Sequence, residues 1–154
     1  MAETNTKIPN RENVPKEYTW ALEDLYASTD EWKKDMEKLK AFIPQITSFQ
    51  GRLGESSKAL LDFLKLQDEI TVLLDSFANY SFRKADEDTK NTTWQGYKDQ
   101  TSSLYVALAG AFSFAEPEIL TISDETLGTF LAEEPALEEY RRYLSNIRRK
   151  RHIF

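Results

Sequence analysis

The longest helical pattern in the chain occupies residues 56–85, which read SSKALLDFLKLQDEITVLLDSFANYSFRKA. Its apolar residues recur three and four positions apart, so they line one face of a helix. They are Leu60, Leu61, Leu64, Ile70, Leu73, Leu74, Phe77 and Tyr80. Ser56 or Ser57 is a suitable N-cap. At 1.5 Å rise per residue, the stretch predicts the longest helix of the chain, roughly 40 Å.

A second helical pattern precedes this stretch. Residues 28–31, Ser-Thr-Asp-Glu, match a capping box and predict that a helix starts there. The apolar stripe that follows is Trp32, Met36, Leu39, Phe42 or Ile43, and Ile46. Pro44 lies inside this pattern and lacks an amide donor, so we expect a kink or break near Phe42. Before the capping box, residues 20–26 contain a short aromatic and aliphatic cluster that is expected to dock as a clasp.

A third helix is expected to open near Asn91. Its predicted inward residues are Trp94, Tyr97, Thr101, Leu104, Tyr105, Leu108 and Phe112. The small residues Ala107, Ala109, Gly110 and Ala111 would permit close approach to a neighbouring helix.

Shorter helices are expected over 116–121 and 124–132, followed by a last helix that opens at Pro135. The buried stripe of the last helix is predicted to be Leu137, Tyr140, Tyr143 or Leu144, and Ile147. The predicted fold class is all-α, an irregular array of antiparallel helices and helical hairpins. We expect residues 1–14 to be a flexible lead-in and residues 15–154 to form one helical N-terminal domain.

The overall composition limits the classes of function. With 154 residues and 40% hydrophobic content, the chain can bury a core. A formal net charge of −6 argues against sequence-independent binding to nucleic acid. The chain has no cysteine and no apolar run long enough to span a bilayer, and its first residues lack the apolar core of a secretory signal. We therefore expect a cytoplasmic protein with no membrane partner.

The sequence offers no complete metal site. A zinc hydrolase helix needs two histidines four residues apart with a glutamate between them, and the only histidine is His152. Asp86 and Asp88 resemble the opening of a calcium loop, but Lys90, Asn91 and Tyr97 stand where an oxygen ligand, a glycine and a glutamate are required. A solvated helix end is the better interpretation.

Other chemistry-bearing groups are also better explained by structure. The pairs Glu133–Glu134 and Glu138–Glu139 lie beside Pro135, where carboxylates complement helix N-termini. A basic cluster near the C-terminus is either a nucleic-acid patch or, as we favour, a helix end packed against acidic surface. Its members are Arg141, Arg142, Arg148, Arg149, Lys150 and Arg151. We assign no catalytic, cofactor-binding or metal residue to this chain.

Four stretches together resemble the N-terminal region of oligoendopeptidase F, a zinc metallopeptidase related to thimet oligopeptidase. They are YTWALEDLY (18–26), TDEW (29–32), PEIL (117–120) and PALEEYRRYL (135–144), the last running on through IRRKRH (147–152). The resemblance covers the chain from about Val14 to His152.

The resemblance implies a cytoplasmic peptidase that cleaves short peptides inside a mainly helical bowl. In that family the zinc ligands and the general-base glutamate lie on a later helix, and none of them corresponds to a residue here. This segment would then form part of the chamber wall, truncated before the catalytic domain, with the remainder of the peptidase as its partner and oligopeptides as substrate. The alternative is a helical protein-interaction module that uses an apolar and basic C-terminal surface.

Overall fold

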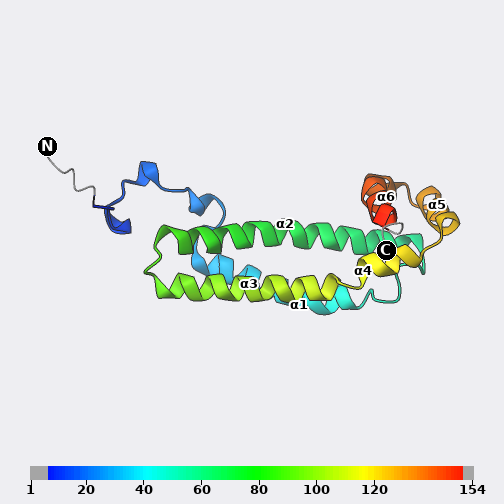
Figure 1. Cartoon of the computed structure of the whole chain (residues 1–154), viewed down its shortest axis with the longest axis horizontal. Helices are drawn as coiled ribbons and strands as arrows, with labels where there is room; N and C mark the ends of the chain where they lie inside the picture. The colour runs from blue at the N-terminus through cyan, green and yellow to red at the C-terminus, as the bar shows by residue number, and fades with distance from the viewer. Residues whose placement is uncertain (1–6, 151–154) are drawn as a thin grey trace.

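The computed structural model describes residues 7–150, and within this range every regular element is a helix. The α-helices are α1 (Thr29–Thr47), α2 (Ser57–Glu87), α3 (Thr92–Phe112), α4 (Ala115–Thr121), α5 (Asp124–Glu133) and α6 (Arg141–Lys150). The 3-10 helices are η1 (Arg11–Asn13), η2 (Lys16–Tyr18), η3 (Leu22–Asp24) and η4 (Pro135–Tyr140). The all-α prediction is therefore confirmed. In Figure 1, α1, α2 and α3 form an elongated bundle, and α4, α5 and α6 gather at one end of it.

Side-chain caps start the three long helices where the sequence predicts. The side chains of Ser28, Ser56 and Asn91 each accept a hydrogen bond from the amide three residues later, at 3.3, 3.1 and 3.2 Å. Such a bond satisfies one of the amides that a helix start leaves without an intrahelical partner. The cap of α2 is thus Ser56 rather than Ser57. Its 31 residues make α2 the longest helix.

A kink or break was predicted near Phe42, and the break is wrong, because α1 continues through Pro44 to Thr47. Phe42 and Ile46 are both buried, so the apolar face is held against the core on either side of the proline. Pro44 itself is exposed and lies in the last turn of α1. A proline there removes one helical hydrogen bond near an end that frays anyway, and packing outweighs that loss.

Trp32 is at the centre of the bundle. Its ring is fully buried and stacks on the Phe77 ring, with centroids 4.6 Å apart and planes 2° from parallel. The indole Nε1 donates a 3.0 Å hydrogen bond to the Phe77 carbonyl oxygen. The rings of Trp94 and Tyr97 from α3 lie 5.5 and 5.1 Å from the Trp32 ring. One side chain of α1 thus joins all three long helices.

The inward face of α3 is narrower than predicted. Thr101, Leu104 and Leu108 are buried, as expected, but Tyr105 is 39% exposed. The four small residues divide: Ala111 is partly buried and packs against the core, whereas Ala107, Ala109 and Gly110 are exposed, and nothing lies within 4 Å of a Cβ built at Gly110. Within residues 7–150 no neighbouring helix therefore covers Ala107, Ala109 or Gly110. A helix turns about 100° per residue, so the residue after Leu104 points well away from the core.

The C-terminal elements differ from the prediction in one respect. Residues from Pro135 to Tyr140 form a 3-10 helix, and the α-helix begins only at Arg141. Leu137, Leu144 and Ile147 are buried, so Leu144 rather than Tyr143 fills the inward position. Over the described residues no single helix is both long and apolar enough to cross a membrane; the pair Thr92–Thr121 and Asp124–Glu133 meets that test only together, with a 105° bend.

A buried polar contact joins α2 to α3. The hydroxyl oxygens of Ser81 and Thr101 lie 2.8 Å apart, and both side chains are fully buried. Replacing Thr101 by Val keeps the shape and removes one hydroxyl from this pair, so Thr101→Val should lower the free energy of unfolding by about 1 kcal/mol. Urea denaturation measures the change. Ser102→Ala is the control: like Thr101, Ser102 donates a hydrogen bond to the backbone carbonyl four residues earlier, but its side chain is exposed. An equal loss in both variants would contradict the prediction.

Candidate functional site

The described residues do not bring metal-binding side chains together. Among residues 7–150 no group of three or more His, Cys, Asp or Glu side chains is arranged to hold an ion. His152 lies outside the described residues. The remaining candidates are therefore the acidic turn, the paired carboxylates, the basic cluster and the surface pockets.

The acidic turn after α2 uses its carboxylates locally. An oxygen of Asp88 accepts a 3.1 Å hydrogen bond from the Lys90 amide, which closes the turn that follows the helix. Asp86 lies 3.9 Å from a guanidinium nitrogen of Arg83 and 3.7 Å from the Lys98 ammonium. These carboxylates face cations and a backbone amide of their own surroundings, so the turn is a solvated helix end whose charges are paired locally.

The paired glutamates face different neighbours. Glu133 accepts a 3.1 Å hydrogen bond from the Ser57 hydroxyl. Both oxygens of Glu138 accept from the Arg141 guanidinium, at 2.5 and 2.9 Å, and this bidentate bond lowers the pKa of Glu138. A carboxylate with a lowered pKa is a weaker base, so Glu138 is poorly suited to act as a general base.

Two residues of the C-terminal basic cluster contact acidic residues of α4 and α5. Arg148 pairs with Asp124 and also donates a 2.6 Å hydrogen bond to the Ile122 carbonyl oxygen. The ammonium of Lys150 lies 3.0 Å from Glu116. These contacts join α6 to α4 and α5. Arg151 lies outside the described residues.

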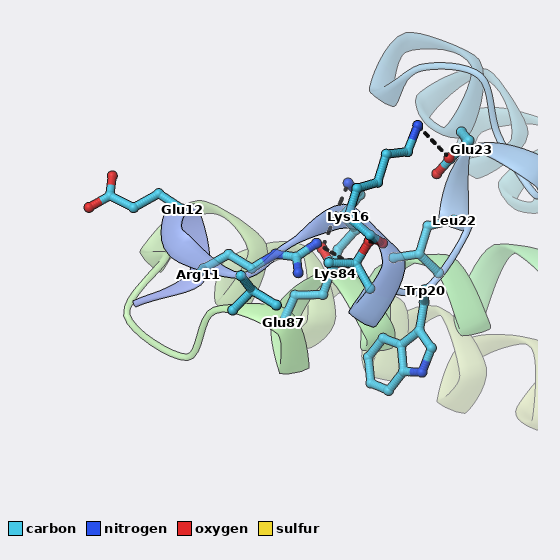
Figure 2. A pocket seen from close by; sticks show the side chains of 10 residues that line it. Arg11, Glu12, Lys16, Trp20, Leu22, Glu23, Lys84 and Glu87 are labelled. Atoms are coloured by element: carbon cyan, nitrogen blue, oxygen red, sulfur yellow. Dashed lines mark hydrogen bonds and ion pairs between the residues drawn. The ribbon is translucent and has the colours of Figure 1, made fainter. Parts of the chain in front are cut away.

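A pocket of about 520 Å³ lies between the N-terminal segment and the end of α2 (Figure 2). Arg11, on η1, donates a 2.7 Å hydrogen bond to Glu87, whose side chain is only 10% exposed. Across the pocket, the Lys16 ammonium lies 3.5 Å from Glu23. A hydrogen bond from the backbone lowers the pKa of Glu23, and Lys16 lowers it further.

The pocket is lined by equal numbers of cationic and anionic side chains, so it presents no excess charge to a ligand. The Arg11–Glu87 contact holds the N-terminal segment on the bundle. Arg11 belongs to the predicted lead-in, yet it contacts Glu87, which lies 76 positions later in the sequence. Leu22 and Tyr26 are buried, which supports the expected clasp, whereas Trp20 is 50% exposed. The Arg83 guanidinium lies 5.1 Å from the centre of the Trp20 ring.

The phenol of Tyr140 links η4 to α2 and gives a pH-dependent prediction. Its hydroxyl donates a 2.7 Å hydrogen bond to Asp68, and burial together with this carboxylate raises the pKa of Tyr140 to about 12. The protonated phenol therefore stabilises the fold below pH 10, and this contribution is lost as the pH rises to about 12. Tyr140→Phe should be less stable than the parent at pH 8, and the difference should shrink above pH 10.

Urea denaturation between pH 8 and pH 12 measures this difference. Tyr18→Phe is the matched control, because Tyr18 is 76% exposed and the same chemical change should leave stability unaltered across the range. A difference for Tyr140→Phe that stays constant from pH 8 to pH 12 would refute the assigned role of the phenol.

Comparison with known proteins identifies several oligopeptidases that this chain resembles. A family model described as Oligopeptidase F matches residues 118–153, which include the second half of α4 and all of α5, η4 and α6. Oligopeptidase PepF from Bacillus subtilis is 32% identical over 145 residues, which are 94% of this chain. The chain is a relative of oligoendopeptidase F.

A second sequence relative and a solved structure agree with this relationship. Group B oligopeptidase PepB from Streptococcus agalactiae is 29% identical over 138 residues, which are 90% of this chain. The crystal structure of oligoendopeptidase-F from Enterococcus faecium superposes with a TM-score of 0.69 and 30% identity over 78% of this chain. The chain spans only 22% and 23% of the two sequence relatives and 24% of the crystallised chain.

The stretches that suggested oligoendopeptidase F are structural parts of the fold. Within the third and fourth of them, Ile119, Leu137 and Leu144 are buried in the core. The family model covers both of these stretches almost completely. The buried residues of these stretches therefore contribute to the packing of the core.

Proposed function

We propose that this chain is the N-terminal helical portion of a zinc-dependent oligopeptidase that hydrolyses short peptides in the cytoplasm. In this proposal the segment is non-catalytic and forms part of the wall of the substrate chamber. The observation that carries it is the match to Oligopeptidase PepF, which extends over 94% of this chain but only 22% of the relative. A segment of that extent supplies scaffold, and the catalytic groups belong to the rest of the peptidase.

A zinc site does not fit the donors of this chain. Its one histidine cannot supply the two imidazoles of a zinc helix, and it has no cysteine. The carboxylates of residues 7–150 are not gathered into a metal-binding group. The proposal therefore assigns no step of peptide hydrolysis to any residue described above.

The first experiment tests whether the segment is inactive alone. The purified chain is mixed with a short quenched fluorescent peptide and zinc, and we expect no hydrolysis above that of buffer with zinc. Turnover that follows the chain through successive columns and disappears with a chelator would overturn the proposal.

The second experiment tests whether the segment is part of a peptidase. In a chimera, this chain replaces the matched 145 residues of Oligopeptidase PepF from Bacillus subtilis. We expect the chimera to hydrolyse the same peptide and the relative without its matched segment to be inactive. A folded but inactive chimera would contradict the proposal.

An interaction module is the second candidate, and one feature of α6 favours it. Arg142 and Arg149 are exposed and lie seven positions apart, so they point to the same side of the helix. This pair is a plausible contact for carboxylates of a partner. A stable complex with an acidic protein, lost in the double variant Arg142→Ala and Arg149→Ala, together with an inactive chimera, would favour the module over the peptidase.

A further inference from the structure

The outer face of α3 differs from the outer faces of α1 and α2. The exposed side chains of α1 include Lys33, Lys34, Glu37, Lys38 and Lys40, and those of α2 include Lys58, Asp62, Lys65, Asp68 and Glu69. In α3, by contrast, no charged residue occurs after Asp99, and the next one along the chain is Glu116. Charged residues make up 30% of the whole chain. A water-facing helix side normally carries such residues, so the exception calls for an explanation.

The residues on this side form a continuous surface, which we call the uncharged α3 face. Its members are Ser102, Ser103, Val106, Ala109 and Gly110, all of them exposed. Spacings of three and four place them together, roughly opposite the buried Leu104 and Leu108. At its centre Val106 is 73% exposed.

The shape of the uncharged α3 face suits another helix. Val106 projects between Ser102 and Gly110, which lie one turn before and after it and are much smaller. Such a row of one larger and two small side chains lets a neighbouring helix approach closely and interlock. The face continues through Ser103 into a groove of about 410 Å³ between α1 and α3, whose apolar lining includes Met36 and Ile43.

The comparisons indicate what covers this face. The chain corresponds to less than a quarter of each relative, and of the crystallised Enterococcus faecium protein. More than three quarters of each of these proteins therefore lies outside the matched segment and is available to pack on it. We propose that the uncharged α3 face is the surface on which a helix from that remaining part docks, using small and apolar side chains. This inference rests on the proposed function.

Because the chain has no cysteine, a single introduced thiol can report whether the docking surface is covered. Val106→Cys places one thiol at the centre of the uncharged α3 face, and Glu37→Cys places one on the charged outer face of α1, where Glu37 is 73% exposed. The rate of thiol alkylation is measured by peptide mass spectrometry in the chain alone and in the chimera with Oligopeptidase PepF. We expect the Val106→Cys thiol to react at least tenfold more slowly in the chimera, and the Glu37→Cys thiol to keep its rate.

The outcomes separate this inference from the proposed function. If the chimera hydrolyses peptide but both thiols are alkylated equally fast, the proposed docking surface is wrong and the peptidase assignment still holds. If the chimera does not fold, the same two thiols are placed at the aligned positions of Oligopeptidase PepF itself, and protection of the one aligned with Val106 supports the inference while its absence refutes it.

Self-association is the competing explanation. If the Val106→Cys thiol is already protected in the chain alone, and if Val106→Arg converts a dimer into a monomer by sedimentation, then a second copy occupies the face and the proposal is wrong. We expect instead that the Val106→Cys thiol is alkylated rapidly in the chain alone. We also expect Val106→Arg to lower peptide hydrolysis by the chimera far more than Glu37→Arg does.

Discussion

Trp32→Ala should lower the free energy of unfolding by about 3–5 kcal/mol, the range found when a large core side chain is truncated. Trp32 is fully buried, and its loss removes the stack on Phe77 together with the ring contacts to α3. It also removes the hydrogen bond to the Phe77 carbonyl oxygen. Because Trp32 joins α1, α2 and α3, the near-ultraviolet circular dichroism should also weaken. Urea denaturation followed by far-ultraviolet circular dichroism measures the stability change.

Trp20→Ala is the matched control. Trp20 is 50% exposed and rests against Arg83, so its removal should change the free energy of unfolding by less than about 1 kcal/mol. Trp32→Phe should lie between the two, because a smaller ring can keep part of the stack but cannot donate a hydrogen bond. Equal losses for Trp20→Ala and Trp32→Ala would show that the bundle is not centred on Trp32.

Arg148→Met should lower the free energy of unfolding by about 2 kcal/mol, since hydrogen bonds from charged groups are worth about 1.5–3 kcal/mol each when part-buried. The Arg148 side chain is 16% exposed and donates to the Ile122 carbonyl oxygen, in the turn between α4 and α5. It also pairs with Asp124 at the start of α5. Methionine has a similar apolar stem, so the loss reports mainly on the guanidinium. Urea denaturation again provides the measurement.

The neighbouring residue supplies the control for this variant. Arg149 is exposed, so Arg149→Met makes the same chemical change with no part-buried contact to break. We expect a change within about 0.5 kcal/mol for Arg149→Met. Hydrogen exchange should locate the effect of Arg148→Met in α4, α5 and α6. Faster exchange spread evenly over α1, α2 and α3 would contradict the local role assigned to Arg148.

The helix starts were predictable because the signal for each is local. Ser28, Ser56 and Asn91 lie within three residues of the amides that they cap, so sequence alone contains both members of each bond. The buried stripe of α2 follows from the same short-range regularity. The oligoendopeptidase F relationship was also readable from sequence, because its motifs are contiguous and occur in a recognisable order.

Other features depend on neighbours that periodicity does not identify. Pro44 predicted a kink or break, but α1 continues through it, with Phe42 and Ile46 buried on either side. Tyr105 was expected in the core, yet only the arc around Leu104 and Leu108 meets α1 and α2. A sequence pattern shows which side chains are apolar, and it does not show how wide an arc the neighbouring helices cover.

The candidate site illustrates the same division. That no two-histidine zinc motif occurs follows from the sequence, because a single histidine cannot form one. The contact between Arg11 and Glu87 had no comparable signal, since the two residues are 76 positions apart and neither belongs to a motif. The uncharged stretch after Asp99 was visible in the sequence, but its meaning required knowing which side of α3 faces outward.

The sequence by itself determined the all-α class, the approximate starts of the long helices and the lack of a zinc motif, because each depends on residue type or on hydrogen bonds within one turn. The tertiary structure decided that Trp32 stacks on Phe77, that Arg148 joins α6 to the turn before α5, and that Val106 faces outward. These depend on contacts between segments distant in the chain, where many pairings satisfy the same local pattern and the packing of the whole bundle selects one.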